Sequence, residues 1–256
     1  MKIKVRNKGY ADASSLDALV LERHTYSGEK FANRQLCQLV SIGSKFNDCD
    51  FANLSIIDCN FGAGKTPSIY YRCRFDAIRT PHISFGYSQF TECHFSGFDF
   101  EGLRISTTDL IRCTFIGRMR NGYIASMRSG FDPPSLGLKE RSVIQDNDFS
   151  EVDFVHFNFK RGVDLTRQRL PTGSNYVLVL NGMQALEKVK QSLLLDDATI
   201  DIRTSVMSFL EILSSEAKKG QENIFLREED FGSMNYLARE FLFNQFRAQA
   251  ELTKEV

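Results

Sequence analysis

The chain has 256 residues, with 32 Lys and Arg against 32 Asp and Glu, so its formal net charge is zero. This balance argues against attraction of the whole molecule to nucleic acid or to an anionic membrane. No apolar run approaches the ~20 residues of a membrane span, and the start of the chain lacks the apolar core of a secretory signal, so we expect a cytoplasmic protein.

Residues 1–30 carry no internal repeat and form the first region of the chain. The stretch 14–24, SSLDALVLERH, predicts a helix with Ser14 or Ser15 as its N-cap. We expect this region to act as an N-terminal cap, because the end of a repeat array exposes apolar side chains and unpaired backbone groups.

A repeat of five residues begins near residue 31 and is clearest between residues 70 and 115. Large apolar residues occupy every fifth position, as at Phe85, Phe90, Phe95 and Phe100. A helix repeats near ~3.6 residues and a strand near ~2, so neither element explains this spacing. A fixed repeat of this kind is typical of a solenoid, in which each unit buries its inner face against its neighbours.

A longer period of twenty residues accompanies the period of five. Cys73, Cys93 and Cys113 are spaced twenty apart, so like residues would lie above one another if four repeats made one turn. The sequence therefore predicts a four-sided coil whose turns pair at the usual inter-strand spacing of ~4.8 Å. The outward charges that would then stack with alternating sign are Arg72, Glu92 and Arg112.

These repeats resemble those of the pentapeptide-repeat proteins, whose unit is roughly Ala-Asp/Asn-Leu-x-x. The segments FANLS at 51–55, NDCDF at 47–51 and RGVDL at 161–165 carry the likeness. The resemblance implies a mainly β fold, a right-handed quadrilateral β-helix whose central Leu or Phe points inward. We assign residues 31–180 to this solenoid. The resemblance specifies a fold and does not specify an activity.

The cysteines follow the same inward pattern and include no CxxC pair. We interpret them as buried core residues, with a metal site or disulfides as the alternative. We therefore expect no metal and no cofactor. The six cysteines are Cys37, Cys49, Cys59, Cys73, Cys93 and Cys113.

Two segments interrupt the repeat. GAGKT at 62–66 looks like the end of a phosphate-binding P-loop, but Cys59 replaces the first Gly of that motif and repeats follow it, so we expect a corner loop. Residues 116–146 are basic and rich in Gly and Pro, which predicts an irregular loop. This loop either contacts a partner or is a solvated excursion. Its candidate partner-binding residues are Arg118, Arg120, Tyr123, Arg128, Lys139 and Arg141.

After the solenoid the pattern becomes helical. Residues 176–180 predict a strand that pairs with the last coil or plugs the tube, and residues 181–256 predict a helical domain with helices at 181–195, 199–219 and 228–254. The last helix has apolar residues off its main stripe, which favours a homodimer contact; packing within one chain is the alternative. The candidate oligomerisation residues are Phe241, Phe243 and Phe246.

No catalytic motif is present, the four histidines are scattered, and a tube filled with Phe leaves no room for a substrate. We expect a non-catalytic solenoid that presents flat walls and a projecting loop to a protein partner, as a dimer. The family resemblance implies two alternatives: a topoisomerase (DNA gyrase)-binding protein of the quinolone-resistance type, and a toxin-immunity or effector protein. Residues 40–170 hold 15 acidic and 16 basic side chains, which argues against mimicry of an acidic DNA duplex.

Overall fold

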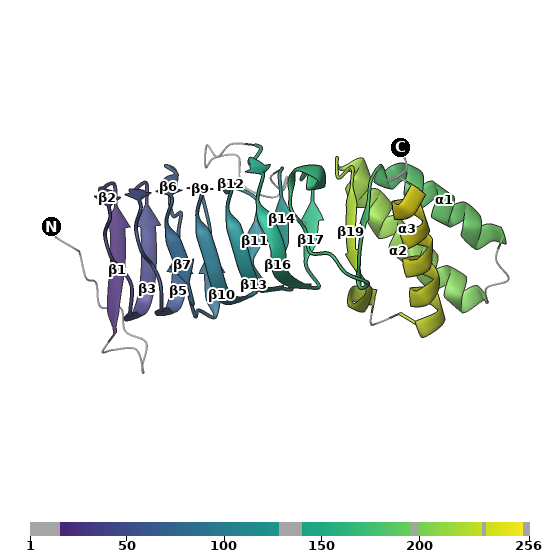
Figure 1. The fold of residues 1–256 in the computed structure, drawn as a ribbon, viewed down its shortest axis with the longest axis horizontal. Coiled ribbons are helices and arrows are strands. Elements are labelled where there is room, and N and C mark those ends of the chain that lie inside the picture. Colours follow the sequence, from purple (N-terminus) through teal and green to yellow (C-terminus); the bar gives the residue numbers. More distant parts are fainter. Residues whose placement is uncertain (1–15, 128–139, 196–198, 232–233, 253–256) are drawn as a thin grey trace. The chain divides into compact units, whose positions relative to one another are not determined.

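A computed structural model describes residues 16–127, 140–195, 199–231 and 234–252 (Figure 1). The chain divides into two compact units. The first extends to Phe157 and includes Arg167–Leu170, and the second comprises Asn158–Thr166 and the chain from Pro171 onward.

The first unit is a β-solenoid of about five turns, built from parallel strands. Its first sheet has the order β1-β3-β5-β8, with bounds Asp17–Glu22, Arg34–Ile42, Leu54–Asn60 and His82–Ser84. A second sheet is β16-β13-β10-β7, with bounds Asp148–Val155, Thr114–Arg120, His94–Glu101 and Arg74–Asp76. A third is β15-β12-β9-β6-β4-β2, with bounds Ile144–Gln145, Asp109–Ile111, Ser88–Thr91, Ser68–Tyr71, Lys45–Asn47 and Thr25–Ser27. β11 (Arg104–Ile105) pairs with β14 (Tyr123–Ala125).

The period of twenty is the register of these sheets. His94 lies between Arg74 and Thr114, and Phe95 lies between Phe75 and Phe115. The rings of Phe75, Phe95 and Phe115 are stacked, with centroids 4.6 and 4.7 Å apart. Such stacking is available because parallel strands place equivalent side chains one inter-strand step apart.

Beside this aromatic column lies a column of buried thiols. All six cysteines are free and buried, which confirms their interpretation as core residues. The Sγ atoms of Cys93 and Cys113 donate to the main-chain oxygens of Tyr70 and Phe90, at 3.5 and 3.4 Å. Asn147 continues the column with an amide that donates to the oxygen of Leu110 at 2.9 Å. These side chains satisfy carbonyl groups inside the core, where an unpaired polar group would be costly.

The helix expected at 14–24 is wrong. β1 occupies Asp17–Glu22, and β2 follows at once, so the coil is already formed before residue 31. Leu19 and Leu21 pair in register with Leu39 and Ser41 of β3 and are buried. Packing on the next turn therefore overrides the local helical spacing. Residues 1–15 of the expected cap lie outside the described residues.

The corner loop at GAGKT is followed by strand β6, and not by the helix that a P-loop requires. Gly86, with a φ of +59°, sits against this loop: a Cβ on it would be 2.3 Å from the oxygen of Gly62. The two glycines thus permit close approach of two turns of backbone where the repeat is interrupted.

The irregular loop expected at 116–146 is much shorter in the structure. β13 runs to Arg120 and β14 follows, and Met119 and Ile124 lie in register with Phe100 and Ile105 of the preceding turn. The register shifts by one residue at Gly97 of β10, which has no partner in β13, so Met119 follows Phe115 at a spacing of four and the repeat continues out of frame. This bulge hides the turn from a search at fixed spacing. Residues 128–139 lie outside the described residues.

The second unit contains β17 (Asn158–Lys160), β18 (Tyr176–Val179), β19 (Ile224–Arg227), α1 (Gly182–Leu195), α2 (Ile200–Lys218) and α3 (Tyr236–Leu252), with short 3₁₀ turns at Leu165–Arg167, where the two units meet in sequence, and Glu228–Phe231. The strand expected at 176–180 is confirmed, but its antiparallel partner is β19, which the sequence did not indicate. The expected helices at 181–195 and 199–219 are confirmed, and the third begins at Tyr236 and not at Glu228.

The expected oligomerisation residues lie in the core of this second unit. Phe243 and Phe246 are 2% and 0% exposed, and Phe241 is partly buried against the same cluster. Phe243 also contacts Phe231, with ring centroids 6.3 Å apart. The alternative, packing within one chain, therefore accounts for their apolar character. Among the described residues, no helix is long and apolar enough to span a membrane.

Candidate functional site

One corner of the solenoid carries a row of charges of alternating sign, which we call the corner row. Five members each follow a strand of the third sheet directly. The sixth, Arg167, lies in the 3₁₀ turn Leu165–Arg167 and continues the row through its ion pair with Asp146. The corner row is Asp48, Arg72, Glu92, Arg112, Asp146 and Arg167. It contains the alternating stack predicted at Arg72, Glu92 and Arg112 and extends it in both directions.

The backbone fixes this row. Asp48, Arg72, Glu92 and Arg112 have φ values of +53°, +51°, +55° and +52°, so each turns the chain in the left-handed region. The N–H of Arg72 donates to the oxygen of Thr91 at 3.0 Å, and that of Glu92 to the oxygen of Ile111 at 2.9 Å. The side chains from Asp48 to Asp146 are therefore held at a regular repeat on a corner of recurring geometry.

Neighbours in the corner row form ion pairs. Arg72 donates to Asp48 through Nε and Nη2 at 2.8 and 2.9 Å, and Arg112 donates to Glu92 through Nη2 at 2.7 Å. Arg167 bonds to Asp146 in the same way, at 2.9 Å. The hydrogen bond from Arg112 holds the pKa of the Glu92 carboxyl below its ordinary value.

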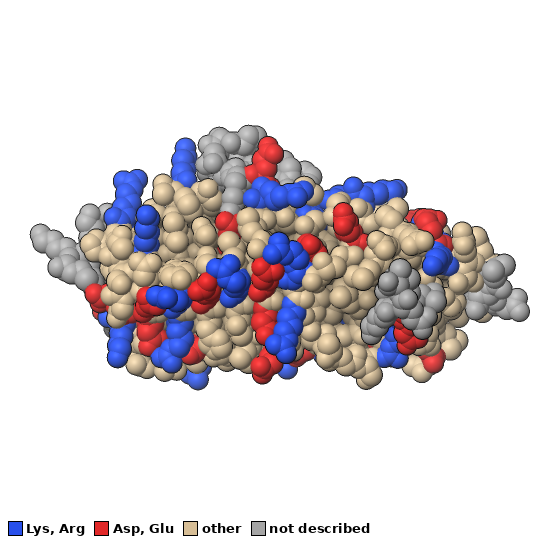
Figure 2. Space-filling view, turned by 45° about the horizontal axis from the view of Figure 1, so that its top comes forward, with Lys and Arg blue, Asp and Glu red and all other residues tan. Residues whose placement is uncertain are grey.

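A second row runs beside the first, which we call the flanking row. Its members also lie directly above one another, through β-bridges and strand register. Arg74 donates to Asp50 at 2.8 Å, and Arg169 donates to Asp148 at 3.2 Å. The flanking row is Asp50, Arg74, His94, Thr114, Asp148 and Arg169; Lys30, which bridges to Asp50, lies one turn beyond it. Figure 2 shows positive and negative side chains intermixed along this face.

The structure does not bring the candidate partner-binding residues together on one loop. Arg118 and Arg120 lie on β13 and not on a loop; Arg118 pairs with Asp153, and Arg120 with Asp99, each at 2.8 Å. Their charges are therefore compensated on the wall. Tyr123 is half-buried on β14, and Arg141 is exposed, with Nη2 3.7 Å from the sulfur of Met127. Arg128 and Lys139 lie outside the described residues.

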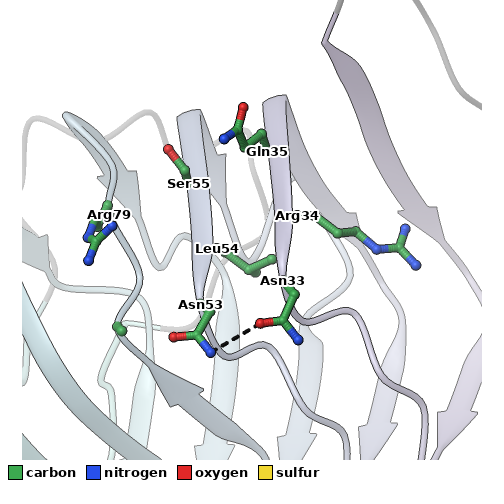
Figure 3. Close-up of a pocket in the computed structure, with 8 residues that line it drawn as sticks. Asn33, Arg34, Gln35, Asn53, Leu54, Ser55 and Arg79 are labelled. Carbon is green, nitrogen blue, oxygen red and sulfur yellow. Dashed lines mark hydrogen bonds between the residues drawn. The ribbon is translucent and has the colours of Figure 1, made fainter.

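A shallow pocket of about 220 Å³ lies elsewhere on the solenoid, across the starts of β3 and β5 (Figure 3). Asn53 donates through Nδ2 to Oδ1 of Asn33 at 3.1 Å, and Figure 3 shows these amides side by side below Gln35 and Ser55. The remaining lining residues are Arg34, Leu54, Ala77 and Arg79. No carboxylate, imidazole or thiol lines this pocket, so it offers no group for general acid–base catalysis at neutral pH.

The described residues include no group of three or more His, Cys, Asp or Glu that could hold a metal ion. Neither known protein families nor curated proteins provide a match to this sequence. We therefore take the corner row and the flanking row, together called the charged corner, as the candidate site, because their members recur in register from turn to turn.

Proposed function

We propose that this protein is a non-catalytic, protein-binding solenoid of the pentapeptide-repeat type, and that its charged corner is the surface that meets a protein partner. The observation that supports this most strongly is the corner row itself: six exposed charges, one from each successive turn, five of them on a corner set by backbone hydrogen bonds. Surfaces with fixed, patterned charges of both signs select partners by electrostatic complementarity.

The same pattern does not favour mimicry of a DNA duplex. A duplex carries negative charge along its whole length. Here the carboxylates of Asp48, Glu92 and Asp146 each contact a guanidinium, so the corner has no continuous negative potential. A partner with both acidic and basic groups fits this surface better than a protein that binds DNA.

The proposal is tested by site-specific photocrosslinking in the native cell. A photoreactive amino acid at Thr114, in the middle of the flanking row, should give a discrete adduct with a different protein. The matched control is the same amino acid at Ser55, an exposed residue on β5 in another sheet. Adducts that contain only this chain, or the same adducts from both positions, would contradict the proposal.

A further inference from the structure

The corner row has an even number of members and strictly alternating signs, which gives it a property that a single charged patch lacks. If the row is laid against a copy of itself in the reverse order, every charge meets its opposite. The six pairs are Asp48 with Arg167, Arg72 with Asp146, Glu92 with Arg112, and the same three pairs with the two copies exchanged.

The flanking row obeys the same rule. In reverse order Asp50 meets Arg169, Arg74 meets Asp148, and the uncharged Thr114 meets His94. A two-fold axis that lies in the plane of a contact and runs across the rows reverses each row without exchanging one row for the other. Corner row then faces corner row and flanking row faces flanking row, so a single symmetry operation satisfies both.

We propose that two copies of this chain associate through the charged corner, with their solenoids antiparallel about such a two-fold axis. The contact is isologous, the commonest arrangement of homodimers. It goes beyond the proposed function, because the second copy is a partner in addition to the different protein, and the contact requires no other protein. It replaces the helical dimer contact, whose phenylalanines are buried in their own unit.

The guanidinium groups have donors left for such a contact. Arg72 uses Nε and Nη2 on Asp48, and Arg112 uses Nε and Nη2 on Glu92, so in both residues the Nη1 hydrogens take no part in these bonds. Because exposed ion pairs contribute little to binding, the dimer is weak. It also dissociates as salt is added, since the Debye length falls from ~10 Å at 0.1 M to ~3 Å at 1 M.

Complementation between two variants tests the contact. E92R places Arg against Arg112 of the second copy, and R112E places Glu against Glu92, each twice per dimer. We expect each variant alone to associate at least about tenfold more weakly than the wild type. A mixture of the two should recover dimers, because Arg at 92 of one copy then meets Glu at 112 of the other. Neither variant contains the native pair within one chain, so recovery reports a contact between chains.

Sedimentation velocity at low and high salt gives the readout, with circular dichroism to verify folding. The matched control is D17R, which changes the charge by the same amount as E92R but lies on β1, outside both rows. It should dimerise as the wild type does. Three results would overturn the proposal: a wild type that is monomeric up to about 1 mM at low salt, a dimer that salt and both reversals leave intact, or a mixture no better than its components. Each could occur while crosslinking to another protein succeeds, so failure here is distinct from failure of the proposed function.

Discussion

At the scale of the residue, the solenoid is held together by columns of identical contacts. Phe95 is fully buried between Phe75 and Phe115, with ring centroids 4.6 and 4.7 Å away. Removing the Phe95 ring leaves a cavity. The rings of Phe75 and Phe115 cannot move to fill it, because the strand register fixes their positions. We therefore expect Phe95→Ala to lower the free energy of unfolding by about 3–5 kcal/mol in urea or thermal melts.

Phe95→Leu is the conservative control and should recover more than half of that loss, since it refills most of the volume. If Phe95→Ala unfolded at the same urea concentration as the wild type, the ring would not be part of a close-packed column.

The thiols provide a second prediction at this scale. Burial raises the pKa of Cys59 and Cys93, which keeps both as unreactive thiols, and all six cysteines are buried. In the native protein at pH 8, an alkylating thiol reagent should modify them only as fast as the solenoid opens, and all six should react at once in denaturant. Rapid labelling of Cys73, Cys93 or Cys113 in the native state would place that residue outside the core.

The sequence predicts these columns where the same residue type recurs. It does not predict them where a different residue type takes the equivalent position. Asn147 takes the place of the next cysteine after Cys113, and its amide bonds the oxygen of Leu110 as the thiols bond theirs. A search for recurring cysteines cannot find this position, because here an amide, and not a thiol, donates to the equivalent carbonyl of the turn.

At the scale of the element, the charged rows couple stability to pH. The hydrogen bond from Arg74 lowers the pKa of Asp50 below its ordinary 3.8, and that from Arg112 lowers the pKa of Glu92 below its ordinary 4.5. A carboxyl with a lowered folded pKa stabilises the fold above its unfolded pKa, and this contribution is lost as pH falls through the folded value. The free energy of unfolding should therefore decline as pH drops below about 4.5.

The matched pair of Asp50→Asn and Asp17→Asn isolates this effect. Asp50→Asn removes an ion pair and should cost about 0–1 kcal/mol at pH 7, with a smaller further loss at pH 3 than in the wild type. Asp17 is exposed on β1 and makes no ion pair within the described residues, so its substitution should leave both values unchanged. Equal acid sensitivity in Asp50→Asn and the wild type would show that this ion pair does not contribute to the coupling.

Three elements differ from what their own sequence patterns predict. The stretch at 17–22 has helical spacing but forms β1, because its apolar residues pack on the turn formed by β3. The sequence predicts a loop where β13 and β14 form a turn, because a one-residue bulge at Gly97 of β10 shifts the repeat. β19 has no repeat of its own and depends on β18 for its pairing. In each case a neighbour distant in sequence decides the structure.

At the scale of the whole molecule, the register explains why the sequence predicts only part of the proposed binding surface. The alternation at Arg72, Glu92 and Arg112 follows from a spacing of twenty. Asp48, Asp146 and Arg167 join the corner row only because loops between turns change the spacing to 24, 34 and 21 residues. The row of six, and with it the self-complementarity, emerges from the register of the sheets and not from any fixed period.

This register is therefore the central claim, and a spin-label distance tests it most directly. Thr25, Lys45, Ile69, Gln89 and Asp109 lie in successive turns of one sheet. Val143 directly precedes the next strand, β15, and its N–H donates to the Asp109 carboxylate at 2.6 Å. Labels at T25C and V143C should be about 24 Å apart, five steps of ~4.8 Å. The native cysteines are buried, and dilution with unlabelled protein removes distances between copies. A single maximum near that distance is the predicted result; a broad distribution without one would contradict the stacked register on which both charged rows depend.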